Sequence, residues 1–527
     1  MYRRATLVSA LLVMSFTLLV VQIGLHMHEG GYEQAAIRQS QTVVTAGTAG
    51  GTIYDRNGVP LVNRSTAYYA AVVPTAAAVA EVLPHVEEMT PFLEGIRSHA
   101  PFCVRVDTDA FSDPDILTLS LPDRSDGGTL APHVIGYVRD GAGVTGLEAD
   151  YDRLLRGEPD TASVTYTVDA RGNVLEGVAP VVAPATQYRA GIVTTLDAEI
   201  QALCEAQPVE KGAIVVMDVE TGDVLAMASF PTYDPDDLAA ALDDPDSPLI
   251  DRCLYSYSVG SIFKLVTCAA AYRQHLTRFQ NVCTGKTSVS GQVFRCHDWR
   301  GHGPLDMEHA IVWSCNTYFV DLSTLLDAAL MRETAQDLGF GTQIALTSSL
   351  VSSPGTLPTM QDLALPAEMA NFCFGQGLLT ATPLQVTQMT CGIANDGDMP
   401  LARLIRGQTD DGVHIENEKA PVYAKALNRN EAYFLQGLMI AAVNENPNSN
   451  AVPSNCFAAG KTSTAQTGRY DKEDAELCHG WITGFFPIES PKYAVTVLCE
   501  DGGYGNDCAA PVFRAIAEAV TARDMAG

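Results

Sequence analysis

The chain begins with a long apolar segment that carries no charge, and this segment is the clearest pattern in the sequence. Residues 5–24 read ATLVSALLVMSFTLLVVQIG. About twenty residues at helical rise span the roughly 30 Å hydrocarbon core of a bilayer. We therefore predict a transmembrane anchor over residues 5–27. A cleaved signal peptide is the alternative, but its apolar region is usually only about 7 to 15 residues long.

Charged residues flank the predicted anchor unequally. Arg3 and Arg4 precede it, whereas Glu29 and Glu33 follow it. Because positively charged flanks tend to stay in the cytoplasm, we expect residues 1–4 to form a cytoplasmic tail. The chain after the anchor would then lie outside the cytoplasm.

Two regions with different patterns of apolar and polar residues follow the anchor. Residues 28–190 contain short apolar stretches broken by Gly, Pro and Asp, a pattern that favours a β-rich domain. Residues 191–527 begin and end with strand-like stretches, GAIVVMDVETGDVLAMASF and KYAVTVLCE, around a helix-rich middle. Strands from the two ends of one segment favour a layered α/β domain. We therefore predict a multidomain α/β protein.

The net charge argues against one class of partner, and the cysteine content bears on whether the chain forms disulfide bonds. Lys and Arg total 33 against 62 acidic residues, which gives a formal net charge of −29. Such a chain repels polyanions, so we exclude nucleic acid as a principal partner. The 13 cysteines fit poorly with an oxidising compartment, where thiols tend to pair. Disulfides between Cys283 and Cys296, and between Cys499 and Cys508, are conceivable from their proximity in sequence, but spacing alone does not establish them.

The segment CHDWRGHG, residues 296–303, contains potential metal ligands. It lacks the paired CxxC or HExxH spacing that would identify a metal site. We therefore interpret it as a loop, and we expect neither a metal ion nor another cofactor.

The stretch YSVGSIFKLVTCAAA, residues 255–269, places Ser261 three residues before Lys264 in an apolar surrounding. On a helix these two side chains share a face, and a helix that is apolar on all sides is buried. Burial would lower the pKa of Lys264 and leave a neutral amine that can act as a base. The pair therefore predicts an activated serine nucleophile. The simpler alternative for so short a pattern is a lysine whose stem covers apolar surface while its charge reaches water.

Two later segments contain polar groups that could complete such a site. The first, AIVWSCNTYFVDL, presents Ser314 and Asn316 between apolar positions, where they could line one side of a cleft. The second, AAGKTSTAQTG, contains a cation followed by three hydroxyls: Lys461, Thr462, Ser463 and Thr464. On a strand Thr462 and Thr464 would share a face, and a nearby lysine would suit a substrate carboxylate.

In this order, the three segments resemble the Ser-x-x-Lys, Ser-x-Asn and Lys-Thr-Gly motifs of penicillin-binding proteins and serine β-lactamases. Longer stretches, such as GTIYDRNG, GVTGLEADYDRLLRG and GWITGFFPIESPKYAVTVLCEDG, resemble class B penicillin-binding proteins. The resemblance implies a bacterial membrane protein with a β-rich pedestal domain over residues 28–190. It also implies a transpeptidase domain over residues 191–527, with a central antiparallel sheet flanked by helices and a helical subdomain.

The resemblance assigns roles in peptidoglycan cross-linking. Ser261 would attack the penultimate D-alanine of stem peptides ending in D-Ala-D-Ala, and Lys264 would accept its proton. Ser314 would pass a proton to the leaving amine, and Asn316 would hold Lys264 and the substrate amide. The terminal carboxylate would bind to the strand that contains Lys461, Thr462, Ser463 and Thr464. Backbone N–H groups of Ser261 and Thr464 would form the oxyanion hole.

Two residues depart from the family pattern. Ser463 replaces the usual glycine of Lys-Thr-Gly, and Val259 replaces the proline that commonly precedes the nucleophile motif. Because serine is small, we expect altered affinity for β-lactams rather than lost activity.

Three functions remain possible at this stage. A transpeptidase is favoured, since a β-lactam-hydrolysing or β-lactam-sensing enzyme would not need a large pedestal. A non-catalytic cell-wall scaffold would be expected to lack Ser261, Lys264 or Lys461, all of which are present. The resemblance also implies a separate SEDS-type glycosyltransferase as partner, because we find no segment that resembles a glycan-polymerising domain.

Overall fold

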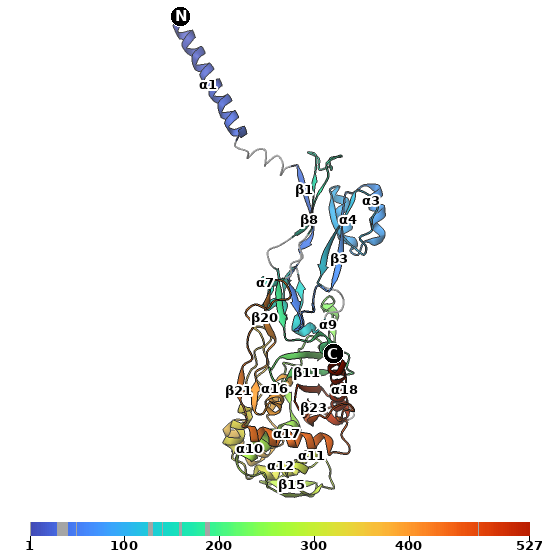
Figure 1. Cartoon of the computed structure of the whole chain (residues 1–527), viewed down its shortest axis with the longest axis vertical. Helices are drawn as coiled ribbons and strands as arrows, with labels where there is room; N and C mark the ends of the chain where they lie inside the picture. Colours follow the sequence, from blue (N-terminus) through green and yellow to red (C-terminus); the bar gives the residue numbers. More distant parts are fainter. Residues whose placement is uncertain are drawn as a thin grey trace. The chain divides into compact units, whose positions relative to one another are not determined.

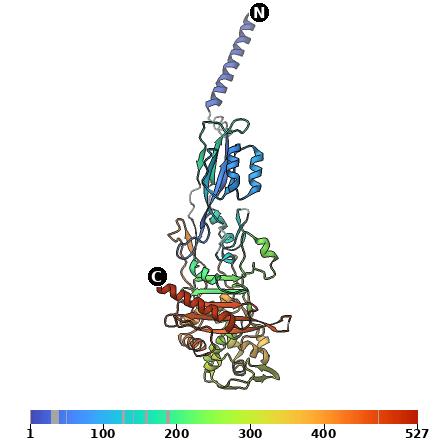
Figure 2. The same ribbon diagram turned by 90° about the vertical axis from the view of Figure 1, so that its right-hand side faces the viewer.

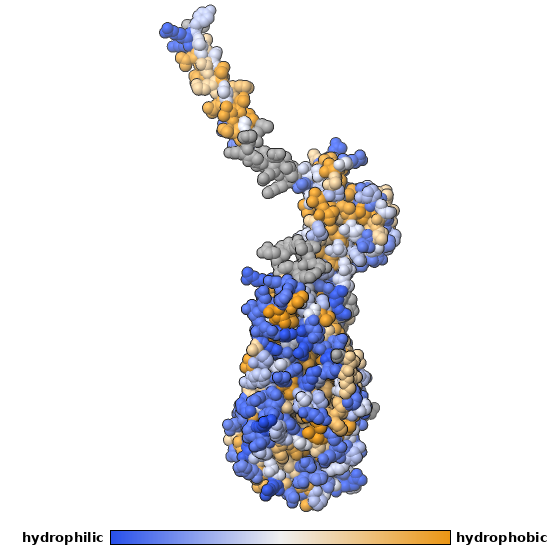
Figure 3. All heavy atoms as spheres, in the orientation of Figure 1, coloured by the Kyte–Doolittle hydropathy of each residue, from blue (hydrophilic) through white to orange (hydrophobic). Residues whose placement is uncertain are grey.

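The apolar N-terminal segment forms helix α1, Tyr2–His28. The helix is long and apolar enough to cross a membrane, and none of its most apolar window is buried. Figure 3 shows its apolar side chains in orange along most of its length. These properties suit the predicted single-pass membrane anchor.

The chain divides into two compact units in the computed structural model, which describes residues 2–28, 40–48, 50–124, 130–139, 141–156, 161–184, 190–472 and 474–526. The first unit contains Met1–Gly50, Asn63–Arg124 and Gly157–Tyr188. The second contains Gly51–Val62, Ser125–Arg156 and Arg189–Gly527. A single boundary at residue 190 therefore does not separate the units, because two earlier segments belong with the C-terminal part.

Strand pairing explains why an early segment belongs to the second unit. Strand β2, Thr52–Tyr54, pairs in parallel with β10, Gly191–Thr194. Strand β10 also pairs with β20, Ile405–Thr409, in antiparallel orientation. Local pattern cannot predict pairing between strands that lie so far apart in the sequence.

The first unit is rich in β-structure, as the sequence predicts. One antiparallel sheet contains β1, Gln41–Thr48, β8, Thr161–Thr167, and β9, Val181–Ala183. The other contains β4, Phe102–Val106, β3, Ser65–Val72, and β5, Ile116–Asp123. Two helices share a core with the second sheet: α3, Ala76–Val82, and α4, Met89–Ser98.

A five-stranded antiparallel sheet forms the centre of the second unit, in the order β12, β11, β24, β23, β22. Their bounds are Val224–Phe230, Gly212–Asp218, Tyr493–Cys499, Glu476–Phe486 and Ala459–Tyr470. The first two strands come from the beginning of the predicted α/β domain and the other three from its end. Strand β22 lies at the edge of the sheet, so one side of its backbone is unpaired among the strands that the structure describes.

Helices cover both faces of this sheet. Helices α8, Ala198–Glu205, and α18, Gly505–Ala526, share a core with one face, and α16, Pro383–Ala394, packs on the other. Figure 1 shows α18 and α16 on opposite sides of β11 and β23. Because both faces are covered, the central strands are almost continuously apolar. The predicted α/β architecture is confirmed.

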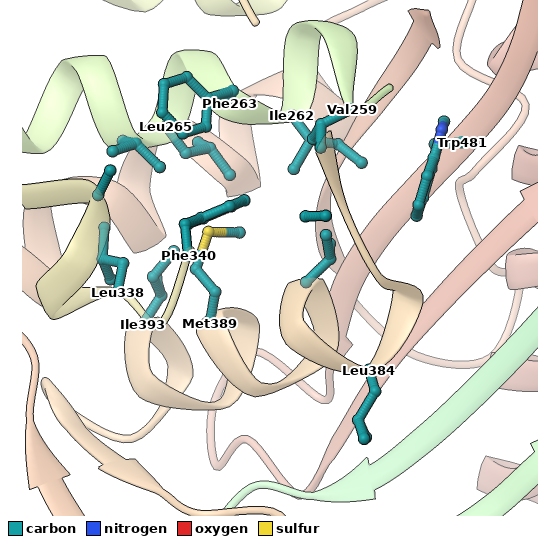
Figure 4. Close-up of a cluster of buried hydrophobic side chains, with 14 of the residues drawn as sticks. Val259, Ile262, Phe263, Leu265, Leu338, Phe340, Leu384, Met389, Ile393 and Trp481 are labelled. Carbon is teal, nitrogen blue, oxygen red and sulfur yellow. The ribbon is translucent and has the colours of Figure 1, made fainter. Parts of the chain in front are cut away.

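The middle of the chain forms a helical subdomain next to the sheet. Figure 2 shows these segments, in yellow and green, beneath the red strands. Its helices include α10, Lys264–Arg273, α11, Met307–Val312, α12, Asn316–Ser323, α13, Ala328–Asp337, α15, Pro366–Cys373, and α17, Arg429–Asn444. The side chains of Phe263, Phe340 and Leu265 meet in its core (Figure 4).

All 13 cysteines are free thiols. Neither Cys283 with Cys296 nor Cys499 with Cys508 forms a disulfide bond. The first of these pairs belongs to the cluster of side chains described below.

An ion pair between Arg252 and Glu500 fixes the end of β24 to the loop before the helical subdomain. The Arg252 side chain is 2% exposed, and its Nε donates to the Glu500 carboxylate at 2.7 Å. Replacing one member of a buried pair leaves the other charge uncompensated, which typically costs about 3–5 kcal/mol.

We expect Glu500→Gln to lower the free energy of unfolding by about 3 kcal/mol, measured by urea denaturation. The matched control is Asp398→Asn, which removes an exposed pair with Lys425 in which both side chains are more than half exposed. That change should cost no more than about 1 kcal/mol. Equal effects of the two substitutions would contradict a stabilising role for the Arg252 pair.

Candidate active site

Ser261 and Lys264 lie one turn apart at the start of a buried helix. A 3-10 segment, Gly260–Phe263, leads directly into α10, and the Lys264 backbone N–H donates to the Ser261 carbonyl. Side chains three residues apart on a 3-10 turn are eclipsed. The structure therefore places the two side chains on one side of the helix.

Lys264 is completely buried, and it is surrounded by neutral acceptors. Its Nζ donates to the Ser314 carbonyl and to Asn316 Oδ1, both at 2.8 Å. Burial lowers the pKa of Lys264 to about 8, because water no longer solvates the ammonium. A useful fraction of this amine is therefore neutral near pH 7, as a base requires.

Ser314 and Asn316 frame the turn between α11 and α12. Ser314 has a φ of 52°, in the left-handed region that residues other than glycine rarely adopt. Asn316 is the first residue of α12. The Ser314 carbonyl and the Asn316 side-chain oxygen both accept from the same ammonium, so the turn and the nucleophile helix are held together at Lys264.

Lys461 approaches the same serine from the edge strand β22. Its Nζ donates to Ser314 Oγ at 3.1 Å and to the Thr462 carbonyl at 2.9 Å. Burial, together with the smaller effect of the nearby Lys264 charge, lowers the pKa of Lys461 to about 7. Ser314 Oγ also lies 3.4 Å from Lys264 Nζ. One hydroxyl therefore contacts two buried amines.

The residues after Lys461 alternate between the two faces of β22. Lys461 and Ser463 are buried, whereas Thr462 and Thr464 are half-buried on the other face. Thr464 Oγ1 accepts from the Gly505 N–H at 3.3 Å, so the hydroxyl proton of Thr464 remains available to a ligand. Thr462 and Thr464 share a face, as the strand pattern predicts.

The structure thus brings together the groups that three separated segments contribute. Within the part of the chain that the structure describes, the Ser261 hydroxyl makes no hydrogen bond, and Ser261 itself is half-buried. A half-buried serine one helical turn before a lysine of lowered pKa, a bridging serine and a second buried amine form a set of groups that can carry out acyl transfer.

A second cluster lies beside this site, and the sequence analysis did not foresee it. Cys283, Cys296, His302 and Cys315 each offer one ligand atom, and these atoms all lie within 4.8 Å of one another. Cys315 stands between Ser314 and Asn316 in the turn described above. Residues 296–302 form a loop, as the sequence predicts, and two of its side chains, Cys296 and His302, belong to a cluster that could hold a metal ion.

Two of the distances in the cluster match those expected around a tetrahedral metal ion. Zinc binds thiolate sulfur at about 2.3 Å and imidazole nitrogen at about 2.0–2.1 Å, so tetrahedral geometry separates two sulfurs by about 3.8 Å and sulfur from nitrogen by about 3.5 Å. The Cys296 and Cys315 sulfurs are 3.8 Å apart, and Cys296 Sγ is 3.5 Å from His302 Nδ1. The hydrogen bond between Cys315 and Cys296 lowers the pKa of the Cys296 thiol and raises that of Cys315, so it favours one thiolate in this pair.

Two of these four residues, Cys283 and Cys315, lie outside the segment 296–303. Twelve residues separate Cys283 from Cys296, and twelve also separate His302 from Cys315. Such long intervals match none of the common short zinc motifs. Two features of the sequence could have indicated the cluster: the repeated interval of twelve residues, and Cys315 in the middle of the Ser-x-Asn motif.

Comparisons with known proteins agree with the geometry. The penicillin-binding protein transpeptidase domain family matches residues 212–518. The chain is 27% identical over 546 residues to peptidoglycan D,D-transpeptidase MrdA of Acinetobacter baumannii, covering 88% of this chain and 80% of that protein. It is 32% identical over 331 residues to peptidoglycan D,D-transpeptidase PbpA of Mycolicibacterium smegmatis, covering 58% of this chain and 66% of that protein.

A solved structure shares the fold. The penicillin G acyl-enzyme complex of penicillin-binding protein A from Mycobacterium tuberculosis superposes with a TM-score of 0.63 at 23% identity, covering 79% of this chain and 96% of that chain.

We expect the purified chain to contain about one equivalent of zinc, measured by plasma mass spectrometry, because the four ligands match tetrahedral coordination. Cys296→Ser should reduce the bound metal at least about 10-fold and lower the melting temperature.

The control is Cys478→Ser, which changes a partly buried thiol outside the cluster and should leave the metal content unchanged. A metal-free wild-type protein, after purification without chelators and addition of zinc, would contradict the assignment.

Proposed function

Since the chain belongs to the penicillin-binding protein transpeptidase family, we propose that it is a peptidoglycan D,D-transpeptidase that acts through an acyl-enzyme on Ser261. The observation that supports this proposal most strongly is the convergence of two lysines, Lys264 and Lys461, on Ser314 Oγ, because Lys264 lies one helical turn after Ser261. The substrates are stem peptides that end in D-Ala-D-Ala, and β-lactams acylate the same serine.

Acylation follows from the positions of the three polar groups. Ser261 Oγ attacks the carbonyl of the penultimate D-alanine, and the neutral Lys264 amine accepts the hydroxyl proton. Collapse of the tetrahedral intermediate breaks the peptide bond. The proton moves through Ser314 to the departing D-alanine amine, which leaves the peptide as an ester on Ser261. Asn316 holds Lys264 in place through its 2.8 Å hydrogen bond.

Strand β22 binds the substrate in this proposal. As an edge strand it can pair with an extended peptide. Lys461 and the hydroxyls of Thr462 and Thr464 receive the terminal carboxylate, and backbone N–H groups of Ser261 and Thr464 stabilise the oxyanion. An anion next to Lys461 favours its charged form, which opposes the effect of burial on the pKa of this lysine.

The second half of the reaction joins two stems. An amine from a neighbouring stem peptide attacks the ester, Ser261 recovers its proton, and a new peptide bond replaces the one that was broken. Hydrolysis by water would instead make the protein a β-lactam-hydrolysing enzyme. We favour the transpeptidase because the chain contains a separate β-rich unit and an apolar N-terminal helix besides the catalytic unit.

The membrane arrangement is also part of the proposal. Arg3 and Arg4 before α1 favour a cytoplasmic N-terminus and an extracytoplasmic catalytic unit. Glycan strands would come from a separate multi-spanning SEDS-type glycosyltransferase, which contacts the anchor and the β-rich unit.

We expect the detergent-solubilised full-length chain to form a stable covalent adduct with fluorescent penicillin, because Ser261 is the nucleophile. Ser261→Ala should abolish the adduct on denaturing gels. Ser258→Ala, a change three residues away, should leave labelling intact. Labelling that persists in Ser261→Ala would defeat the nucleophile assignment, and rapid loss of the adduct would favour a hydrolase.

The two lysines predict a bell-shaped pH dependence of acylation. Lys264 must be neutral to accept a proton, and its pKa of about 8 makes acylation fall as the pH drops below that value. Lys461 must be charged to bind a carboxylate, and its pKa of about 7 makes acylation fall as the pH rises. The other titratable neighbours of Lys264 are the thiols of Cys268, Cys296 and Cys315.

We therefore expect the second-order acylation rate constant to reach its maximum between about pH 7 and about pH 8. Lys461→Arg, which stays charged at all accessible pH values, should remove the alkaline decline. Stopped-flow measurements between pH 5.5 and 9.5 test this expectation, and a flat profile in the wild type would contradict it.

A further inference from the structure

Ser463 occupies a buried position between the edge strand and the nucleophile turn. Its side chain lies on the same face of β22 as Lys461, and the residue is only 3% exposed. Ser463 Oγ donates to the Val259 carbonyl at 2.7 Å. The residue that departs from the family motif therefore makes a hydrogen bond that a glycine could not make.

This hydrogen bond is one of three that hold consecutive residues of the nucleophile turn. The Trp481 indole N–H donates to the Ser258 carbonyl at 3.1 Å, and the Gly260 N–H donates to the Gly375 carbonyl at 2.9 Å. Trp481 lies directly opposite Ser463 in the pairing of β22 with β23. Figure 4 shows Val259 at the start of the helix and Trp481 on the neighbouring strand. Two adjacent strands, β22 and β23, therefore each donate one side-chain hydrogen bond to the turn.

Gly260 is required for the contact with Ser463. Its φ of 63° is left-handed, and a Cβ atom at this position would lie 2.4 Å from Ser463 Oγ. Such a separation is far shorter than van der Waals contact. The serine at position 463 and the glycine at position 260 are thus packed against each other.

The hydrogen bond between Ser463 and Val259 joins the two segments that supply the proposed oxyanion hole. Val259 is two residues before Ser261, and Ser463 directly precedes Thr464. The proposed function assigns the backbone N–H groups of Ser261 and Thr464 to the oxyanion. One buried hydrogen bond therefore fixes the backbone beside one donor to the backbone beside the other.

We propose that Ser463 is a positioning residue that holds the two oxyanion donors at their working separation. The proposal rests on the proposed function. Donors that stabilise a developing charge must be preorganised, and a displacement of about 1 Å can reduce a rate by about 100-fold. Without the hydroxyl, β22 and the turn can separate slightly. The effect should fall on the acylation step, because the groups that bind the substrate carboxylate remain in place.

The test measures acylation of the full-length, detergent-solubilised chain by fluorescent penicillin in a stopped-flow instrument. The dependence on penicillin concentration separates the dissociation constant of the initial complex from the acylation rate constant. We expect Ser463→Ala to lower the acylation rate constant about 10-fold and to change the dissociation constant by less than about 2-fold. Ser463→Gly, which restores the family residue, should have the same effect because it also lacks the hydroxyl.

Thr195→Val is the matched control. Thr195 is fully buried after β10, and its Oγ1 donates to the Val224 and Arg403 carbonyls at 2.7 and 2.8 Å, away from the turn. This variant removes a buried hydroxyl too, so it should lower the melting temperature and leave the acylation rate constant unchanged. The two serine variants also remove a buried hydroxyl, so they should lower both the melting temperature and the acylation rate constant.

Wild-type acylation in both Ser463 variants would overturn the proposal. A changed dissociation constant with an unchanged rate constant would also overturn it, because Ser463 would then act in binding. Equal losses of rate in Thr195→Val and Ser463→Ala would show a general effect on stability and would overturn it as well. Failure of the proposed function looks different, since the wild-type chain itself would then form no adduct on Ser261.

Discussion

The active site depends on burying two amines around one hydroxyl without a carboxylate to neutralise them. Among the residues that the structure describes, Lys264 and Lys461 donate hydrogen bonds only to neutral oxygens: the Ser314 and Thr462 carbonyls, Ser314 Oγ and Asn316 Oδ1. The Lys264 ammonium also lies 5.4 Å from the centre of the Phe319 ring. Removing an ammonium from water typically costs several kcal/mol. A carboxylate at this position would offset that cost and would keep both lysines charged. In the proposed mechanism, one of these amines acts as a base and the other receives an anion from the substrate, in a chain whose net charge is −29.

The fold brings this pair together from elements that are far apart in the sequence. Lys264 comes from the first turn of α10, Ser314 from the turn before α12, and Lys461 from the edge strand β22. The five-stranded sheet is covered on both faces, so its edge is the place where an extended substrate can pair with backbone groups. Catalytic groups therefore meet where the helical subdomain faces that edge.

The sequence predicted the parts of this arrangement that local pattern determines. The apolar surroundings of Lys264 indicated burial, and strand alternation placed Thr462 and Thr464 on one face. Local pattern could not predict which distant strands pair, for example the parallel pairing of Thr52–Tyr54 with Gly191–Thr194. The thiol cluster was missed for the same reason. Cys283 and Cys315 lie 32 positions apart, and only the folded chain brings their sulfurs together.

Ser314 connects the cysteine cluster to catalysis through its backbone. A left-handed conformation costs a residue with a Cβ atom roughly 1–2 kcal/mol, so the surrounding contacts must maintain it. Lys264 holds the Ser314 carbonyl from one side, and Cys315, the next residue, contacts Cys296 from the other. A metal ion on that sulfur would fix the same peptide that positions the Ser314 hydroxyl between the two lysines. In the proposed mechanism, proton transfer therefore depends on a turn that two contacts restrain. Lys264 holds the Ser314 carbonyl, and Cys296 contacts the next residue, Cys315.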